Sequence, residues 1–251
     1  MKHNSMGKRK LPFILIALGS LLGILVLGFF IYAGQYYHTD SKARTSLTEN
    51  DQITLSYEKD YFVLSPKEDA LDTGLIFYPG GKVEHDAYAR MLSTLTESGY
   101  TCIIPKMPFH LAVFDQDAAT PIMADFPEIK NWYIGGHSLG GAMAATYASE
   151  HSESLKGLVL LGAYSTKDLS TLPLKVLSIY GSEDEVLNKE NYENNKIYLP
   201  QDTTELCIEG GNHAFYGDYG VQKSDGTATI TPEEQQMLTA NAILEFLKTS
   251  N

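Results

Sequence analysis

The chain has only two cysteines among its 251 residues. Two thiols allow at most one disulfide, so the fold cannot depend on a framework of bridges. Cys102 and Cys207 both stand in apolar, strand-like runs, and we expect two small buried side chains without a bridge. The sequence also has no group of histidines, cysteines and acids at metal-ligand spacing, so neither a metal nor another cofactor is expected.

Positive charge is scarce beyond residue 45. Residues 46–251 hold 13 Lys/Arg against 30 Asp/Glu, a formal balance of −17. A body this acidic repels phosphate backbones, so the composition argues against nucleic acid as a partner. We interpret the excess of acids as a solvated surface that aids solubility.

Long apolar runs are absent with one exception, residues 11–34, which are 24 residues without a charge. A helix of that length spans roughly 36 Å, enough to cross the hydrocarbon core of a bilayer with some tilt. Four Lys/Arg precede the run and only two follow it closely. The positive-inside rule therefore predicts a cytoplasmic tail at residues 1–10 and a folded domain on the far side of the cell membrane.

A cleaved signal peptide is the alternative for this run. Such a peptide has an apolar core of about 7–15 residues and a small-x-small cleavage site. The run here is longer, and Ile31-Tyr32-Ala33 is a poor cleavage site, so an uncleaved single-pass anchor is favoured. The polar residues 35–50 predict a tether, which leaves residues 51–251 as the folded domain.

The folded domain shows alternating strand-like and helix-like segments. Residues 52–66 have the alternation of an antiparallel pair at a sheet edge. Six short apolar runs of the kind needed by parallel strands under helices follow: 73–80, 100–105, 131–138, 155–164, 174–184 and 204–213. Helix-like stretches lie at 85–99, 117–129, 141–154, 190–197 and 231–250. The order predicts a mostly parallel, doubly wound α/β sheet with helices on both faces.

The stretch GGHSLGG at residues 135–141 joins a predicted strand to a predicted helix. A sharp turn at that place leaves no room for side chains at Gly136 and Gly140, and it aims the Ser138 hydroxyl out of the sheet edge. The N–H of Leu139, at the start of the helix, then points to where an oxyanion would form. A serine that merely caps the helix is the simpler alternative.

Three other strand ends supply the groups that a serine nucleophile needs. IFYPGGKV at 76–83 offers a second oxyanion donor, which we assign to the N–H of Gly81 with Lys82 as the runner-up. YGSEDEV at 180–186 offers a carboxylate. Asp184 is the best choice there because it stands three residues past Gly181, while Glu183 and Glu185 remain open as alternatives.

His213 is the predicted base because, of the seven histidines, it alone lies on a glycine loop after the last strand and after the acid. His137 adjoins Ser138 on the turn, so its ring is expected to point away. His110 follows a strand and could line a pocket. The polar loop 217–230 that follows His213 is equally a pocket wall or a surface loop.

The order Ser138, Asp184, His213 on alternating strands resembles the α/β-hydrolase superfamily. The chain from about residue 52 is most similar to compact bacterial serine hydrolases near the dienelactone hydrolases. The matching residues are Tyr78-Pro79-Gly80-Gly81, Gly136-His137-Ser138-Leu139-Gly140-Gly141, Gly181-Ser182-Glu183-Asp184 and Gly211-Asn212-His213-Ala214. Two features depart from that pattern: Ser138 replaces the cysteine nucleophile of dienelactone hydrolases, and Pro79-Gly80 replaces the usual His-Gly before the oxyanion donor.

The resemblance implies a carboxylic ester hydrolase that works through an acyl-enzyme, and the predicted anchor at residues 11–34 would place it at the membrane. Its partner would be a small-molecule or lipid-like acyl ester. Only residues 165–173 lie where many relatives insert a cap, so we expect an uncapped, open site. Two alternatives remain: an acyltransferase with the same triad, and a catalytically inactive binding protein on the hydrolase fold. The sequence does not fix the oligomeric state.

Overall fold

The computed structural model describes residues 6–46 and 51–249. The chain divides into two compact units, residues 1–36 and 37–251. The first unit is a helix, α1 (Met6–Ala33), and its part Phe13–Ala33 is long and apolar enough to cross a membrane. A signal sequence near the N-terminus can pass the same test of length and composition, so the test does not separate it from an uncleaved anchor. The cytoplasmic tail at 1–10 therefore stays a prediction, and residues 1–5 of it lie outside the described residues.

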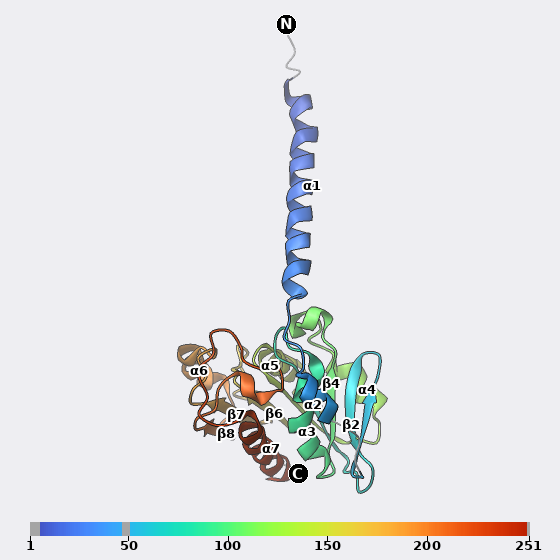
Figure 1. Cartoon of the computed structure of the whole chain (residues 1–251), viewed down its shortest axis with the longest axis vertical. Coiled ribbons are helices and arrows are strands. Elements are labelled where there is room, and N and C mark those ends of the chain that lie inside the picture. The colour runs from blue at the N-terminus through green and yellow to red at the C-terminus, as the bar shows by residue number, and fades with distance from the viewer. Residues whose placement is uncertain (1–5, 47–50, 250–251) are drawn as a thin grey trace. The chain divides into compact units, whose positions relative to one another are not determined.

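The second unit is built on one eight-stranded sheet with the strand order β1-β2-β4-β3-β5-β6-β7-β8 (Figure 1). The first two strands form an antiparallel pair at one edge, β2 runs antiparallel to β4, and every later pair is parallel. The strands are β1 (Ile53–Tyr57), β2 (Tyr61–Pro66), β3 (Thr73–Tyr78), β4 (Thr101–Pro105), β5 (Asn131–His137), β6 (Gly157–Leu161), β7 (Lys175–Gly181) and β8 (Thr203–Ile208). The predicted mostly parallel sheet is confirmed.

Helices cover both faces of this sheet, as predicted. The α-helices of the second unit are α2 (Ser41–Ser46), α3 (Ala89–Thr96), α4 (Ala119–Asp125), α5 (Leu139–His151), α6 (Lys189–Asn195) and α7 (Pro232–Thr249). Thr231 caps α7: its hydroxyl accepts the N–H of Glu234, whose carboxylate accepts the N–H of Thr231 in return. Residues 162–174, between β6 and β7, hold neither helix nor strand, so no cap domain covers the sheet edge.

Two cores form because strand side chains alternate between faces. On β3, Leu75 and Phe77 pack with residues of α3 and α7, whereas Ile76 and Tyr78 pack with residues of α4 and α5. All four side chains are fully buried. Burial of an aliphatic or aromatic side chain contributes about 1.5–3 kcal/mol, so these cores hold the strand ends firmly in place.

The segment predicted as a tether is partly folded, and the structure differs here from the sequence-based boundary. The Tyr37 N–H donates to the Lys82 carbonyl at 2.7 Å, and the Tyr37 carbonyl accepts the Glu84 N–H at 2.9 Å. Helix α2 follows, so the compact unit begins at Tyr37 rather than at residue 51. Polar composition suggested a free linker because the contacts that hold it lie more than 40 residues away in the chain. Residues 47–50 lie outside the described residues.

Both cysteines are free, as expected, but only one of them is buried. Cys102 lies in the core on β4, where burial raises the pKa of its thiol to about 12. Cys207 is exposed, contrary to expectation, because β8 is the edge of the sheet and pairs with β7 alone. An apolar sequence run did not distinguish an edge strand from a central one.

Candidate active site

Ser138 occupies the turn between β5 and α5, in a conformation that few residues other than glycine adopt. Its φ is 53° and its ψ is −122°, and its N–H donates to the Leu161 carbonyl of β6 at 2.9 Å. A positive φ of this kind costs of order 1–3 kcal/mol and persists only where surrounding structure enforces it. The simple helix-cap interpretation does not hold, because the Ser138 side chain makes no capping hydrogen bond to α5.

Two glycines make this turn possible. A Cβ on Gly140 would lie 2.3 Å from the carbonyl oxygens of Tyr78 and Pro79, and a Cβ on Gly136 would lie 2.6 Å from the carbonyl carbon of Gly140. These neighbours are main-chain atoms and cannot swing aside. The absence of side chains at these two positions lets the end of β3 lie against the first turn of α5, and Gly81 lies against Leu139.

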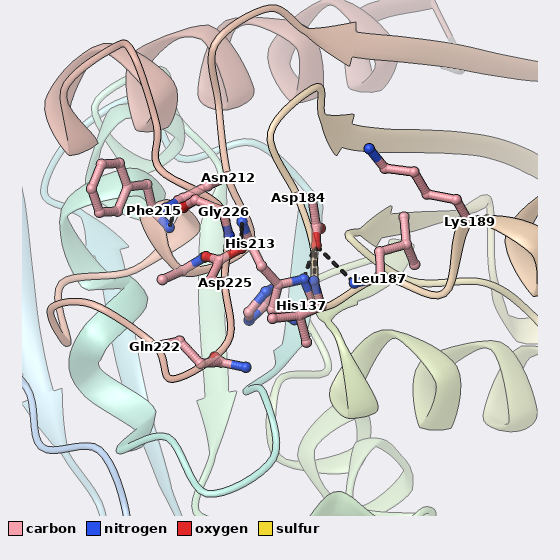
Figure 2. Close-up of polar contacts among 12 residues, drawn as sticks. His137, Asp184, Leu187, Lys189, Asn212, His213, Phe215, Gln222, Asp225 and Gly226 are labelled. Carbon is pink, nitrogen blue, oxygen red and sulfur yellow. Dashed lines mark hydrogen bonds and ion pairs between the residues drawn. The ribbon is translucent and has the colours of Figure 1, made fainter.

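Asp184 and His213 form the pair that the sequence indicates. Asp184 Oδ2 lies 2.8 Å from His213 Nδ1, and both side chains are almost completely buried (Figure 2). The other oxygen, Oδ1, accepts the N–H groups of Val186 at 2.9 Å and Leu187 at 2.7 Å. These bonds fix the carboxylate and leave one oxygen for the imidazole. Asp184 therefore holds His213, and the alternatives Glu183 and Glu185 do not.

The second predicted oxyanion donor lies against the first. A Cβ on Gly81 would be 3.0 Å from Leu139 Cδ2 and 3.3 Å from Leu139 Cβ. Within the described part of the chain, the Gly81 N–H donates to no other group, and Leu139 is the first residue of α5, whose N–H has no acceptor inside the helix. The N–H of Lys82, the runner-up, donates instead to the His110 carbonyl at 2.7 Å.

Ser138 and His213 open onto one cavity of about 320 Å³. Nε2 of His213, the nitrogen that Asp184 leaves available, has no hydrogen-bond partner among the described residues. Besides these two, the residues that line the cavity are Leu139, Ala142, Gly162, Ala163, Tyr164, Thr166, Val186, Leu187 and Asn188. The lining is apolar or neutral apart from the histidine, so it suits an uncharged group bound next to Ser138.

A model described as the alpha/beta hydrolase family matches residues 74–237, which include all of these site residues. The chain belongs to the alpha/beta hydrolase family. A comparison with curated protein sequences gave no match.

Solved structures of three hydrolases illustrate the likeness. A predicted CIB-like hydrolase from Thermoplasma acidophilum has a TM-score of 0.57 at 15% identity, over 77% of this chain and 99% of that one. A bacterial membrane phospholipase A, described as a virulence factor, has a TM-score of 0.59 at 14% identity, over 97% of this chain and 99% of that one. Est1E from Butyrivibrio proteoclasticus has a TM-score of 0.57 at 14% identity, over 80% of this chain and 99% of that one. Identities this low show the fold alone.

Two residues that sequence reasoning missed support His213 in this alpha/beta hydrolase. Asp225 accepts the N–H groups of His213 at 3.2 Å and Ala214 at 2.8 Å. Gln235, on α7, accepts the Asn212 N–H at 2.9 Å and donates to the Asn212 carbonyl at 2.7 Å. Asp225 belongs to the 217–230 loop, none of whose residues lines the cavity at Ser138. Through Asp225 the loop binds the main chain at His213 (Figure 2).

The ring of His137 does not line the cavity at Ser138, as expected, but it packs against His213, which was not expected. Its centroid lies 4.5 Å from that of His213, and its Nδ1 lies 2.9 Å from the hydroxyl of Tyr88. His137 is the last residue of β5, so its side chain alternates to the sheet face on which α3 and α7 pack. His110 does not line the cavity.

One group of possible metal ligands escaped the sequence analysis because Asp117 lies far in the chain from the adjacent residues Glu150 and His151. Ligand atoms of Asp117, Glu150 and His151 lie within 4.8 Å of one another. The two acids are exposed, and none of the three residues lines the cavity at Ser138.

Proposed function

We propose that this chain is a membrane-anchored serine hydrolase that cleaves carboxylic esters through an acyl-enzyme. The observation that carries the proposal is the hydrogen bonding and position of the His213 ring. Asp184 holds its Nδ1, while Nε2 has no partner among the described residues and the ring lines the same cavity as Ser138. A base held in this way is suited to take a proton from a serine.

In the proposed reaction, His213 Nε2 accepts the proton of Ser138 as its Oγ attacks the ester carbonyl. The N–H groups of Gly81 and Leu139 donate to the oxyanion that forms. The C–O bond of the ester then breaks, and the alcohol leaves with the proton from His213. Water attacks the acyl-enzyme with the same histidine as base, which releases the acid and restores Ser138. Each step uses side chains and amides of the chain itself.

The proposed substrate is an uncharged acyl ester, small or lipid-like. The cavity of about 320 Å³ is lined by apolar and neutral side chains and has no Lys or Arg among its lining residues. The apolar helix α1 supports a location at the cell membrane, with residues 1–10 cytoplasmic and the hydrolase domain on the other side. One structural neighbour is itself a membrane phospholipase A, which fits a lipid-like ester.

The proposal is tested with p-nitrophenyl esters of increasing acyl length and the full chain in detergent. We expect hydrolysis of short and medium chains, and a loss of about 10⁴-fold or more in Ser138→Ala. Hydrolysis that persists in Ser138→Ala would contradict the proposal. A folded wild-type protein that hydrolyses no member of the series would contradict it as well. Supplying an alcohol as second acceptor separates a hydrolase from an acyltransferase, because only the latter favours ester product over free acid.

A further inference from the structure

The hydroxyl of Tyr88 connects the oxyanion loop, residues 79–84, to His137, whose ring packs against His213. Tyr88 ends the short 3-10 helix η1 (His85–Tyr88) and is fully buried. Its Oη accepts the N–H of Gly80 at 2.9 Å and lies 2.9 Å from Nδ1 of His137. A Cβ on Gly80 would lie 2.7 Å from that nitrogen and 2.8 Å from the hydroxyl. The absence of a side chain at residue 80 therefore permits this contact.

These contacts determine where the protons lie. Tyr88 Oη already accepts one hydrogen bond, and its own proton has no acceptor among the described residues other than His137 Nδ1. Burial raises the pKa of Tyr88, so the hydroxyl keeps its proton. Burial, and next the nearby charge of His213, lower the pKa of His137 well below its ordinary value. His137 is thus neutral. If Tyr88 donates to its Nδ1, the ring proton is on Nε2, which is buried without a hydrogen-bond partner among the described residues.

A neutral ring in this place matters because it packs directly against the base. The ring centroids of His137 and His213 lie 4.5 Å apart, with an angle of 48° between the planes. During acyl transfer His213 becomes an imidazolium, and a second positive charge at this distance would repel it. The same neutral ring also limits how far His213 can turn away from Asp184.

We propose that Tyr88 and His137 are positioning residues. They hold Gly80 and Gly81 of the oxyanion loop and the ring of His213 in the relative positions that acyl transfer needs. Neither lines the cavity at Ser138, so both act through the groups that they support. The inference rests on the proposed function of Ser138 and His213, and it adds two residues that the Ser-Asp-His order does not contain. It also explains why Gly80, which donates to no oxyanion, has to be a glycine.

The test compares Tyr88→Phe with Tyr216→Phe in the full chain. Tyr216 is a matched control because it is fully buried and its ring lies 5.3 Å from that of His137. Its hydroxyl has no hydrogen-bond partner among the described residues. We expect Tyr88→Phe to lower kcat about ten- to a hundredfold with KM within about twofold, because the oxyanion donor is misplaced while the cavity is unchanged. Tyr216→Phe should stay within about twofold of wild type in both constants.

A nitrogen-15 NMR spectrum of the histidine rings gives a readout independent of ester hydrolysis. In wild type, His137 should show the neutral form protonated at Nε2, and Tyr88→Phe should lose that preference while Tyr216→Phe keeps it. Equal kcat values for the two variants, or a wild-type His137 protonated at Nδ1, would overturn the proposal. If the wild-type protein hydrolyses no ester but shows this tautomer, the proposed function is wrong, whereas the hydrogen bond from Tyr88 to His137 is supported.

Substitution of His137 keeps the proposal testable if Tyr88→Phe does not fold. His137→Asn retains an oxygen that can accept the Tyr88 proton, whereas His137→Leu does not. We expect His137→Asn to keep at least about tenfold more of the wild-type kcat than His137→Leu. Equal kcat values in these two variants would contradict a positioning role that depends on the hydrogen bond.

Discussion

The two halves of the candidate site are held by different kinds of contact. Ser138 and Asp184 are fixed by main-chain groups, namely the Leu161 carbonyl and the N–H groups of Val186 and Leu187. Asp184 in turn holds His213. The oxyanion loop, residues 79–84, is held by a nearby residue, Tyr88, and by a residue far from it in the chain, Tyr37. Tyr88 binds Gly80 by a side chain, while Tyr37 binds Lys82 and Glu84 by its main chain.

This difference separates the proposed triad, which would carry out acyl transfer, from the side chains around the oxyanion loop, which would adjust the position of a donor. A change at a main-chain contact of the nucleophile half disrupts the turn or the imidazole directly. A change in the side chains around the oxyanion half displaces a donor by a small distance and leaves the triad in place. We therefore expect losses of activity to be larger in the first half than in the second.

The largest effect is expected for Asp184→Asn. The amide oxygen is expected to take the place of Oδ1 and accept the N–H groups of Val186 and Leu187, so the NH2 group faces His213 Nδ1 and cannot accept its proton. The imidazole then loses its tautomer and orientation. We expect kcat to fall about 10⁴-fold, measured with a p-nitrophenyl ester. Glu183→Gln is the matched control beside it and should stay within about twofold of wild type. Equal losses in the two variants would reassign the acid.

A large effect is also expected for Gly140→Ala. The added methyl group would lie 2.3 Å from two main-chain oxygens, so the contact between β3 and α5 has to open. Because that contact sets the position of Ser138 and of the 79–84 loop together, kcat should fall at least about a hundredfold. Thermal unfolding of the same sample shows whether the protein stays folded. A folded variant with wild-type kcat would disprove the steric account of the turn.

A smaller effect is expected for Gln235→Ala, behind the base. Gln235 is fully buried, and its loss leaves the N–H and the carbonyl of Asn212 without their partners. We expect the free energy of unfolding to fall by about 1–3 kcal/mol and kcat to fall about tenfold. Chemical denaturation and ester kinetics measure the two quantities. Unchanged values for both would mean that Gln235 does not support His213.

The smallest effect is expected for Arg44→Gln, in the segment that precedes the hydrolase core. Arg44 binds the buried carboxylate of Asp86 at 2.9–3.0 Å and Glu84 at 3.0 Å, and the neighbouring carboxylates raise its pKa. Because Arg44 is 47% exposed, solvent screening limits the loss of unfolding free energy to about 1–2 kcal/mol.

The decrease in kcat for Arg44→Gln should be a few-fold, with KM unchanged. Lys59→Gln removes a fully solvated pair with Asp60 and serves as the control without effect. If Arg44→Gln matched Lys59→Gln in stability and in kcat, residues 37–46 would be the passive tether that their composition suggests.

The sequence predicted the fold and the proximity of Asp184 and His213 because both depend on local patterns. Strand and helix periods predict the sheet, and the glycines around Ser138 are needed within the same turn. Glycine loops at strand ends likewise marked Asp184 and His213. For the carboxylate partner of His213, the sequence favoured Asp184 and left Glu183 and Glu185 open. Only the folded chain shows that Asp184 reaches His213.

The oxyanion half escaped the sequence because its contacts join distant residues. Nothing in the order of residues relates Tyr88 to His137, or Arg44 to Asp86, since each pair lies more than 40 positions apart. His137 looked like a neighbour that should turn away, yet its place at the end of β5 brings its ring against His213. Polar residues 37–46 looked like a linker for the same reason.

Covalent labelling of Ser138 by a fluorophosphonate probe tests the central claim most directly. The full chain in detergent is treated with the probe, and the modified peptide is identified by mass spectrometry. The account predicts that the wild type is labelled at Ser138, that Ser138→Ala is not labelled, and that His213→Ala is labelled at least about a hundredfold more slowly. A folded wild-type protein that takes up no probe, or that takes it up at another residue, would contradict the account.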